Sequence, residues 1–234
     1  MSTLIRPFFG YYGGKWRDTP RLYPPPEYPV IIEPFAGSAG YSVRYYDRLV
    51  VLCDLDPVIA GVWDYLIKVT PQEVLAIPDV PLDGCVDDLG LCQEASWLVG
   101  FWLNRGVAAP CKTPSAWMRK GIRPGSFWGP KVRRRIASQV GLIRHWRVSN
   151  RSYEESSRGL ATRFVDPPYQ VAGKHYRHGS KGIDYEHLGS WCQGQEGQTI
   201  VCEGPGADWL PFRDQGLRKT ARKTPSMERV WLNY

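Results

Sequence analysis

The chain contains 234 residues, enough to bury one substantial core with a smaller lobe attached. Its hydrophobic content of 43% and aromatic content of 13% exclude a disordered chain, and no apolar stretch approaches the roughly 18 residues that span a bilayer. A net charge of +7 excludes no class of partner by itself. Because the chain is apolar enough to fold and has no stretch that spans a bilayer, we expect a folded, soluble and cytoplasmic protein with no membrane partner.

The first predicted elements alternate between strand and helix. Residues 28–33 (YPVIIE) are a β-branched run that predicts a buried strand, and PFAGSAG predicts a tight turn leading into a helix over 41–49. A second strand is predicted at 49–53 and a second helix at 57–69, with Pro57 in its first turn. This order predicts the first half of a doubly wound, Rossmann-like α/β fold.

The middle of the chain is basic and aromatic. Residues 71–94 are acidic and predict loops, a helix is predicted at 96–104, loops again over 110–130, and a basic helix over 131–146. Residues 95–153 hold twelve Lys or Arg, five Trp and no Asp or Glu, which leaves −5 for the rest of the chain. Basic side chains interleaved with aromatic ones suit a nucleic acid. The alternative is a solvated basic face packed on a tryptophan-rich core.

The last third predicts a return to the sheet. Strands are predicted at 146–148, 163–166, 198–203 and 229–233, with a helix at 184–193 and no internal repeat. The six cysteines include no CxxC pair, and His175 and His178 lack further ligands at metal spacing. We therefore predict reduced thiols and no metal site.

Two predicted strand ends carry features of a cofactor site, because open α/β sheets bind ligands outside the carboxyl ends of their strands. Gly37 and Gly40 permit a ligand to approach the backbone, yet the turn is neither a dinucleotide GxGxxG nor a phosphate loop with its lysine. Asp54 ends the next strand, 21 residues beyond Glu33, where a carboxylate can bind ribose hydroxyls. An adenosine-bearing cofactor without a polyphosphate fits this set, and S-adenosylmethionine is the candidate.

A third strand end, in RFVDPPYQ (163–170), suggests a site for a planar amine. The strand stops at Asp166 because Pro167 and Pro168 have no N–H, so nearby carbonyls remain as fixed acceptors. A charged acceptor, a neutral acceptor and the ring of Tyr169 are thereby held together. The alternative is an ordinary strand-terminating turn.

The motifs GYYGGK (10–15), EPFAGSAG (33–40), LCDLD (52–56), a basic insert and VDPPY (165–169) follow one another in this order. In that order the chain resembles the DNA adenine-N6 methyltransferases of the Dam type, with their alpha order of motifs, and the final ERVWLNY is similar to the end of short phage or bacterial members. The family usually has a second glycine where this chain has Ala39.

The resemblance implies a methyltransferase domain of residues 1–70 and 148–234, with a target-recognition subdomain of helices and loops inserted at 71–147. It implies a catalytic loop of Asp166, Pro167, Pro168 and Tyr169. The implied cofactor-binding residues are Tyr11, Tyr12, Lys15, Glu33, Phe35, Gly37, Ser38, Asp54, Leu55 and Asp166. The predicted DNA-binding residues are Arg119, Lys120, Arg123, Lys131, Arg133, Arg134, Arg135, Arg144 and Arg147.

The expected function is methyl transfer from S-adenosylmethionine to the N6 amine of adenine in double-stranded DNA, in a bacterial cell or a phage-infected host. Asp166 and the Pro167 carbonyl would each accept one N–H of a base extruded from the duplex, and Tyr169 would stack on it. No obligate protein partner is inferred.

Three other functions remain open. Cytosine-N4 methylation uses the same geometry for another aromatic amine. A protein-glutamine methyltransferase resembles enzymes with an NPPY loop but lacks a basic block of this size. A DNA-binding protein with an inactive cofactor fold is disfavoured by the intact Lys15, Asp54 and Asp166.

Overall fold

The computed structural model describes residues 4–122, 125–218 and 225–233, and a sheet of seven strands forms its centre. The strands are β1 (Val30–Glu33), β2 (Leu49–Cys53), β3 (Arg147–Ser149), β4 (Ala161–Val165), β5 (Gly197–Glu203), β6 (Arg213–Arg218) and β7 (Ser226–Leu232). Their order is β3-β2-β1-β4-β5-β7-β6; β7 pairs antiparallel with β5 and β6, and the other neighbouring strands pair in parallel. The mostly parallel sheet confirms the predicted α/β class and is compatible with a Rossmann-like fold.

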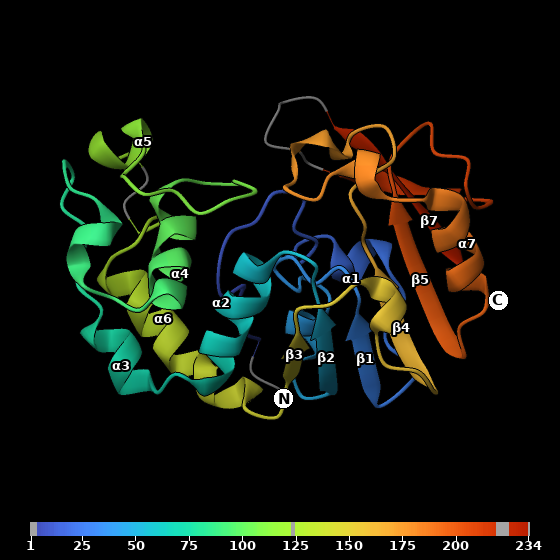
Figure 1. Cartoon of the computed structure of the whole chain (residues 1–234), viewed down its shortest axis with the longest axis horizontal. Coiled ribbons are helices and arrows are strands. Elements are labelled where there is room, and N and C mark those ends of the chain that lie inside the picture. The colour runs from blue at the N-terminus through green and yellow to red at the C-terminus, as the bar shows by residue number, and fades with distance from the viewer. Residues whose placement is uncertain (1–3, 123–124, 219–224, 234) are drawn as a thin grey trace.

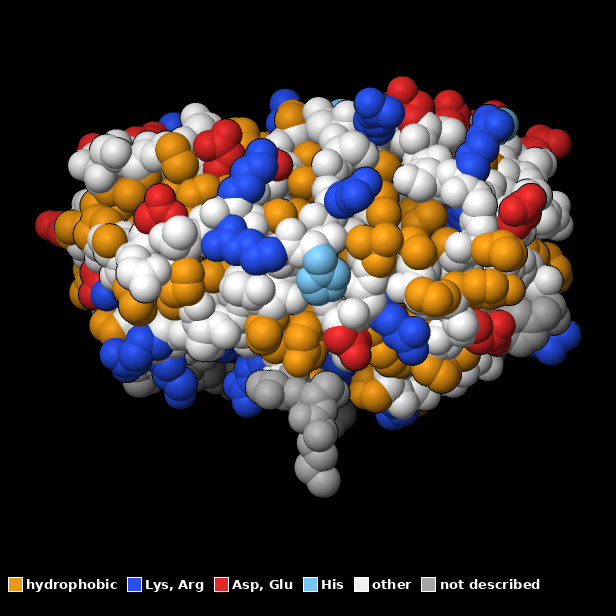
Figure 2. All heavy atoms as spheres, turned by 90° about the horizontal axis from the view of Figure 1, so that it is seen from below, with side chains coloured by type: hydrophobic (Ala, Val, Ile, Leu, Met, Phe, Trp, Pro, Cys, Tyr) orange, Lys and Arg blue, Asp and Glu red, His pale blue; other side chains and the backbone are white. Residues whose placement is uncertain are grey.

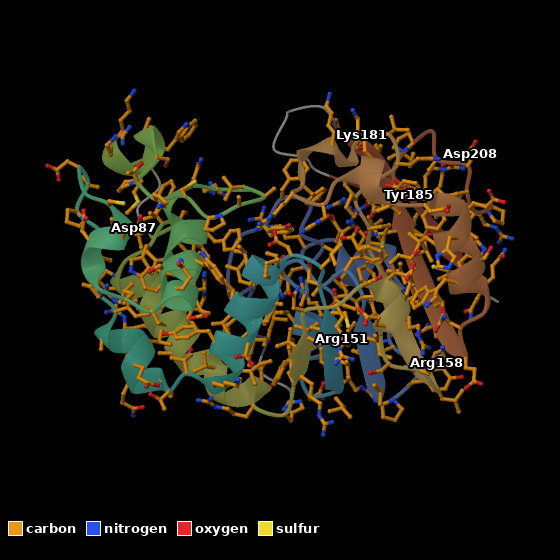
Figure 3. The ribbon with its side chains drawn as sticks, in the orientation of Figure 1. Asp87, Arg151, Arg158, Lys181, Tyr185 and Asp208 are labelled. Atoms are coloured by element: carbon orange, nitrogen blue, oxygen red, sulfur yellow. The ribbon has the colours of Figure 1, made fainter. Side chains whose placement is uncertain are left out.

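The strand order reverses between β1 and β4, where doubly wound sheets bind their ligands at the carboxyl ends of the strands. Figure 3 shows which end this is: Arg158, which precedes β4, lies at the lower end of the sheet, whereas Lys181 and Tyr185, which follow β4, lie at the upper end. The upper end in Figures 1 and 3 is therefore the end at which a ligand site is expected.

The helices lie on both faces of the sheet and to one side of it (Figure 1). They are α1 (Thr19–Leu22), α2 (Pro57–Lys68), α3 (Pro71–Ala76), α4 (Gln93–Leu103), α5 (Ala116–Arg119), α6 (Pro130–Val140) and α7 (Tyr185–Gln193). Asp56 begins α2 by accepting a hydrogen bond from the Val58 N–H at 3.0 Å. Helices α3 to α6 gather beyond α2, and we call residues 71–146 the helical lobe.

The core divides at the sheet because neighbouring strand residues face opposite sides. Phe164 joins the cluster that includes the buried face of α2, whereas Val165 joins the cluster under α7. The first cluster continues into the helical lobe and includes Phe101 of α4 and Trp128 before α6. The lobe therefore shares its core with the sheet.

The helix predicted over 41–49 is wrong, since only a short 3₁₀ helix, Ser42–Tyr45, forms there. The carbonyls that would continue a helix are bound elsewhere: the Tyr46 carbonyl accepts from Trp146 Nε1 at 3.1 Å, and the Arg48 carbonyl lies 2.9 Å from His145 Nε2. The short connection thus docks against the end of the helical lobe.

Loops alone over 71–94 are also wrong. Helix α3 occupies Pro71–Ala76, and Thr70 and Glu73 form a capping box at its start. A 3₁₀ helix follows at Val86–Leu89.

Other boundaries differ less. The basic helix ends at Val140 and continues as a 3₁₀ turn, α5 forms within the predicted loops of 110–130, and α1 and β6 were not predicted. The remaining predicted strands and helices are present within about three residues of their expected bounds. In the described part of the chain, no helix is both long and apolar enough to cross a membrane.

Candidate active site

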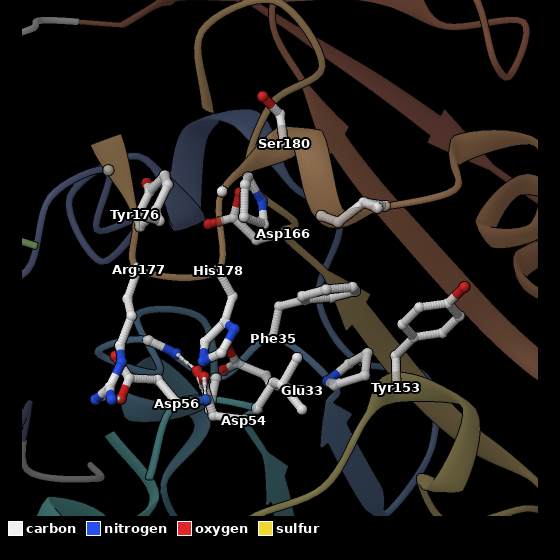
Figure 4. A pocket seen from close by; sticks show the side chains of 18 of the residues that line it. Glu33, Phe35, Asp54, Asp56, Tyr153, Asp166, Tyr176, Arg177, His178 and Ser180 are labelled. Atoms are coloured by element: carbon white, nitrogen blue, oxygen red, sulfur yellow. Dashed lines mark hydrogen bonds and ion pairs between the residues drawn. The ribbon is translucent and has the colours of Figure 1, made fainter. Parts of the chain in front are cut away.

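A cavity of about 770 Å³ opens at the carboxyl ends of β1, β2 and β4, at the point where the strand order reverses (Figure 4). Its walls come from residues 11–15, the turn over 33–40, residues 54–56, Asp166, and the segment 174–184. The volume suits a small-molecule ligand. Four of the motifs noted in the sequence therefore meet in one cavity.

Asp166 follows β4 directly and is 21% exposed. Its carboxylate accepts a hydrogen bond from the ammonium group of Lys15, which is only 3% exposed. Burial raises the pKa of Asp166 above its usual range, and the positive charge of Lys15 opposes this rise. Lys15 therefore favours the ionised form of a carboxyl whose pKa burial raises.

The two prolines after Asp166 differ in their carbonyls. The Pro168 carbonyl accepts a hydrogen bond from the Tyr185 hydroxyl at 2.5 Å. Among the described residues, no donor is bonded to the Pro167 carbonyl. Asp166 lines the cavity, whereas Pro167 is buried and is absent from the described lining, so the second predicted acceptor stays a prediction.

Tyr169 is oriented differently from the expected base-stacking residue. Its hydroxyl donates to Glu228 Oε1 at 2.7 Å and lies 3.4 Å from Nη1 of Arg218, and its ring is 4.9 Å from Lys15 Nζ. It is absent from the described lining of the cavity, whereas Asp166 and Pro168 belong to it. Tyr169 supports the cavity from behind.

Sequence reasoning missed the group that holds Tyr169. Glu228 of β7 is 1% exposed, accepts from the hydroxyls of Tyr23 and Tyr169, pairs with Arg218 at 3.1 Å and lies 3.9 Å from Lys15 Nζ. The available signal was that Glu228 directly precedes the terminal strand predicted at 229–233.

The glycine turn over 33–40 is hydrogen-bonded to Asp54, directly after β2. Gly37 has a φ of +44°, and its N–H donates to Asp54 Oδ2 at 2.9 Å; Asp54 Oδ1 accepts from the Asp56 N–H at 2.9 Å. Ala39 also has a positive φ, of +46°, so the turn keeps a left-handed residue where the resembled family has glycine. Burial raises the pKa of Asp54 to about 6, although the two N–H donors oppose this.

Glu33 is a buried wall of the cavity, with 2% of its surface exposed. It accepts a hydrogen bond from the Ser42 N–H at 2.7 Å. Burial raises its pKa to about 8, so the side chain is mostly a neutral carboxyl at pH 7. It can therefore donate as well as accept a hydrogen bond inside the cavity.

Aromatic side chains form much of the remaining wall. Phe35 stacks on Tyr153 with ring centroids 5.5 Å apart, and Tyr11 packs edge-on against Phe101 at 5.9 Å. Leu55 also lines the cavity and is 52% exposed. Gly14 brings the backbone close to Ser38, since a Cβ at Gly14 would lie 3.0 Å from the Ser38 hydroxyl.

The segment 171–184, which follows the DPPY loop (166–169), lies across the cavity. Arg177 pairs with Asp56 at 3.5 Å, and the Tyr176 hydroxyl donates to the Tyr12 carbonyl at 3.2 Å. Figure 4 shows Arg177 and His178 extending from this segment toward Asp54 and Asp56. These contacts join the segment to the end of β2 and to the N-terminal motif.

The predicted DNA-binding residues fall into two groups. Arg133, Arg135 and Arg144 serve the fold: Arg133 pairs with Asp79, Arg135 lies 4.7 Å from the Trp102 ring, and Arg144 donates to carbonyls at the end of α2. Arg144 is nevertheless exposed, as are Arg119, Lys120, Lys131, Arg134 and Arg147. Arg123 lies outside the described residues.

Charges of both signs are interspersed on the face of the molecule opposite the cavity. Figure 2 shows this face, seen from below Figure 1, with Lys and Arg beside Asp and Glu and with hydrophobic side chains between them. Because positive and negative side chains are mixed on this face, it has no uniformly positive surface that would attract a polyanion. Within the described ranges, no group of three His, Cys, Asp or Glu residues is arranged to hold a metal ion.

No protein-family model matches the chain, and no curated protein matches it. The functional assignment therefore depends on the cavity itself.

Proposed function

We propose that the chain is a DNA methyltransferase that transfers a methyl group from S-adenosylmethionine to the N6 amine of adenine. The observation that carries the proposal is the Lys15–Asp166 pair at the end of β4, inside the same cavity as the glycine turn and Asp54. The Asp166 carboxylate supplies one acceptor for an aromatic amine, and the Pro167 carbonyl, which accepts from no donor among the described residues, is the proposed second acceptor.

The donor set of the cavity fits an adenosine linked to an amino acid. Asp54 has carboxylate lone pairs left for two ribose hydroxyls after its bonds to Gly37 and Asp56. Phe35 and Tyr153 offer apolar ring surface for a purine. The turn over 33–40 contains no Lys or Arg, as suits a cofactor without a polyphosphate. When bound, S-adenosylmethionine supplies a methyl group made electrophilic by its sulfonium.

The residues of the chain act mainly by orientation. The lone pair of an adenine amine is delocalised into the ring, and acceptors at both N–H groups favour a pyramidal nitrogen that can react. Burial raises the pKa of Asp166, and the ammonium group of Lys15 opposes this rise, so the pair favours the ionised carboxylate that accepts an N–H. The amine becomes acidic only once it is methylated, and its proton then leaves by way of this carboxylate or to water.

The DNA partner of the proposal rests on charge. The twelve basic residues of 95–153 are not balanced by any acidic residue in that stretch, and six of the nine predicted contacts are exposed on the structure. Phosphate contacts of this kind bind any duplex, and the target base must then be extruded into the cavity.

Nucleoside analysis tests the proposal directly. The purified protein is incubated with S-adenosylmethionine and unmethylated plasmid DNA, and the digested DNA is analysed by mass spectrometry. We expect N6-methyladenine. N4-methylcytosine would keep the site and change the base, whereas no methylated nucleoside, together with no binding of S-adenosylmethionine, would refute the proposal.

A matched pair of variants locates the reaction. Asp166→Asn keeps the shape of the side chain but removes the charge beside Lys15, so turnover should fall about 100-fold or more. Asp208→Asn is the control because Asp208 is an exposed carboxylate that does not line the cavity. Equal turnover in the two variants would remove Asp166 from the mechanism.

A further inference from the structure

The aromatic ring of the catalytic loop is already engaged within the protein. Tyr169 is held through its hydroxyl by Glu228 and Arg218, and its ring packs beside Lys15 Nζ. A Cβ built on Gly204, which directly follows β5, would lie 2.8 Å from the ring, so the backbone there packs closely against Tyr169. A base in the cavity could reach the face of Tyr169 only if these contacts were broken.

A second tyrosine stands in the cavity next to Asp166. Tyr176 lies on the segment 171–184, lines the cavity and is half-buried. Its ring centroid is 5.9 Å from that of Tyr11 and 5.7 Å from that of Tyr12. Figure 4 shows its ring beside Asp166, and after burial the Asp166 carboxylate is the largest cause that raises the pKa of Tyr176.

The surroundings of Tyr176 suit an incoming base. Tyr12 is 41% exposed, so the two rings stand where the cavity meets solvent. The Tyr176 hydroxyl is bonded to the Tyr12 carbonyl, which fixes the ring without using its faces. The Tyr176 ring therefore lines the same cavity as the Asp166 carboxylate and lies near the opening of that cavity to solvent.

We propose that Tyr176, and not Tyr169, supplies the aromatic face that stacks on the target base, and that Tyr169 is a positioning residue that acts through Glu228 on the Lys15–Asp166 pair. The inference rests on the proposed function and adds to it the residue that selects a flat heterocycle. The target is a base extruded from DNA, because stacking on an aromatic side chain favours a flat ring and does not require that ring to be charged.

The two roles predict opposite responses to the same substitutions. At position 176 the ring matters and the hydroxyl does not: Tyr176→Phe should retain most activity, whereas Tyr176→Leu should lower kcat/KM for DNA by roughly 10- to 100-fold, the usual effect of losing one base–aromatic stack. The Kd for S-adenosylmethionine should change by less than about threefold in Tyr176→Phe, which keeps the wall of the cavity.

At position 169 the hydroxyl matters. Tyr169→Phe keeps the ring but removes a donor from buried Glu228, so kcat should fall by roughly 10-fold. Among the described residues, Lys15, Glu228 and Arg218 are the charged groups that act most strongly on Asp166, and the buried carboxyls of Glu33 and Glu203 also interact with it. A less neutralised Glu228 draws Lys15 away from Asp166, so the acidic limb of the kcat profile should move to higher pH.

The experiment measures methyl transfer to DNA by the wild type and by the Phe and Leu variants at both positions, with the pH profile of kcat and the thermal midpoint of each. If the wild type transfers no methyl group to DNA, the proposed function fails. If the wild type is active, the inference is overturned when Tyr176→Leu and Tyr169→Phe both retain wild-type activity. The pH profile keeps the test valid even if Tyr169→Leu does not fold.

Discussion

Gly40 brings the glycine turn into contact with the backbone of the N-terminal motif, so Gly40→Ala should displace Lys15. A Cβ at position 40 would lie 2.6 Å from the Trp16 nitrogen, 2.8 Å from the Lys15 nitrogen and 3.1 Å from the Lys15 carbonyl carbon. These are backbone atoms, which cannot move aside by a change of rotamer. The segment 15–16 must therefore shift as a whole.

The size of the shift follows from these distances. Ordinary contact for a Cβ begins at 3.4 Å, so the closest atom must move away by about 0.8 Å. Overpacking of this kind costs about 1 to 3 kcal/mol of the free energy of unfolding. A displacement approaching 1 Å at a reacting group costs about 100-fold in rate, so we expect turnover to fall by about 10- to 100-fold through the Lys15–Asp166 pair.

Gly141→Ala is the matched control because a Cβ there meets nothing within 4 Å and Gly141 has a helical φ of −64°. Its stability should be unchanged or raised by up to about 1 kcal/mol. Urea denaturation and methyl-transfer kinetics are measured for both variants. If Gly40→Ala retained wild-type turnover, the close approach at Gly40 would have no part in placing Lys15.

Three further predictions concern buried and exposed charge. Burial raises the pKa of Glu33 from 4.5 to about 8, so the folded state holds a proton that the unfolded state releases, and the free energy of unfolding falls as pH rises from 4.5 to 8. Relative to Glu33→Gln, the wild type should lose on the order of 5 kcal/mol of this free energy above pH 8. If urea unfolding of the two proteins depended on pH in the same way, the burial effect would be contradicted. Asp54→Asn should weaken binding of S-adenosylmethionine by about 10-fold or more in calorimetry, and the wild-type affinity should decrease below about pH 6, where the Asp54 carboxylate becomes protonated. Arg134→Gln should reduce the slope of log K against log salt for DNA binding by about 0.9, because Arg134 is exposed. Arg133→Gln breaks the pair with Asp79 and should instead lower the thermal midpoint. If Arg134→Gln lowered the thermal midpoint and Arg133→Gln reduced the slope, α6 would be excluded as a phosphate-contacting helix.

The sequence predicted the parts of the site that depend on short stretches of chain. Gly37, Asp54 and Asp166 each stand at the end of a β-branched or apolar run, and parallel strands bring such ends to one edge of a sheet. The capping box at Thr70 and Glu73 was equally local and could have identified α3. Composition concealed it, because acidic and proline-rich segments usually form loops.

The orientation of Tyr169 could not be predicted in the same way. It depends on Glu228, which is 59 residues away on an antiparallel strand, and on Arg218 of the neighbouring strand. The contacts of Arg133 and Arg135 likewise depend on distant residues: Asp79, in the loop after α3, and Trp102 of α4. Charge counting identifies a basic segment but does not distinguish side chains that contact solvent from those that hold the fold together.

The core shared by the helical lobe and the sheet limits how the protein can diversify. Phe101 of α4 stacks on Phe9 at 4.9 Å and packs against Tyr11 in the cavity wall, while Trp102 Nε1 donates to the Phe8 carbonyl at 2.9 Å. A lobe transplanted from another protein would not reproduce these contacts and would disturb the cavity along with its own surface. Change in this lineage is therefore expected to proceed by replacing outward side chains, as on α5 and α6, rather than by exchanging the lobe as a cassette.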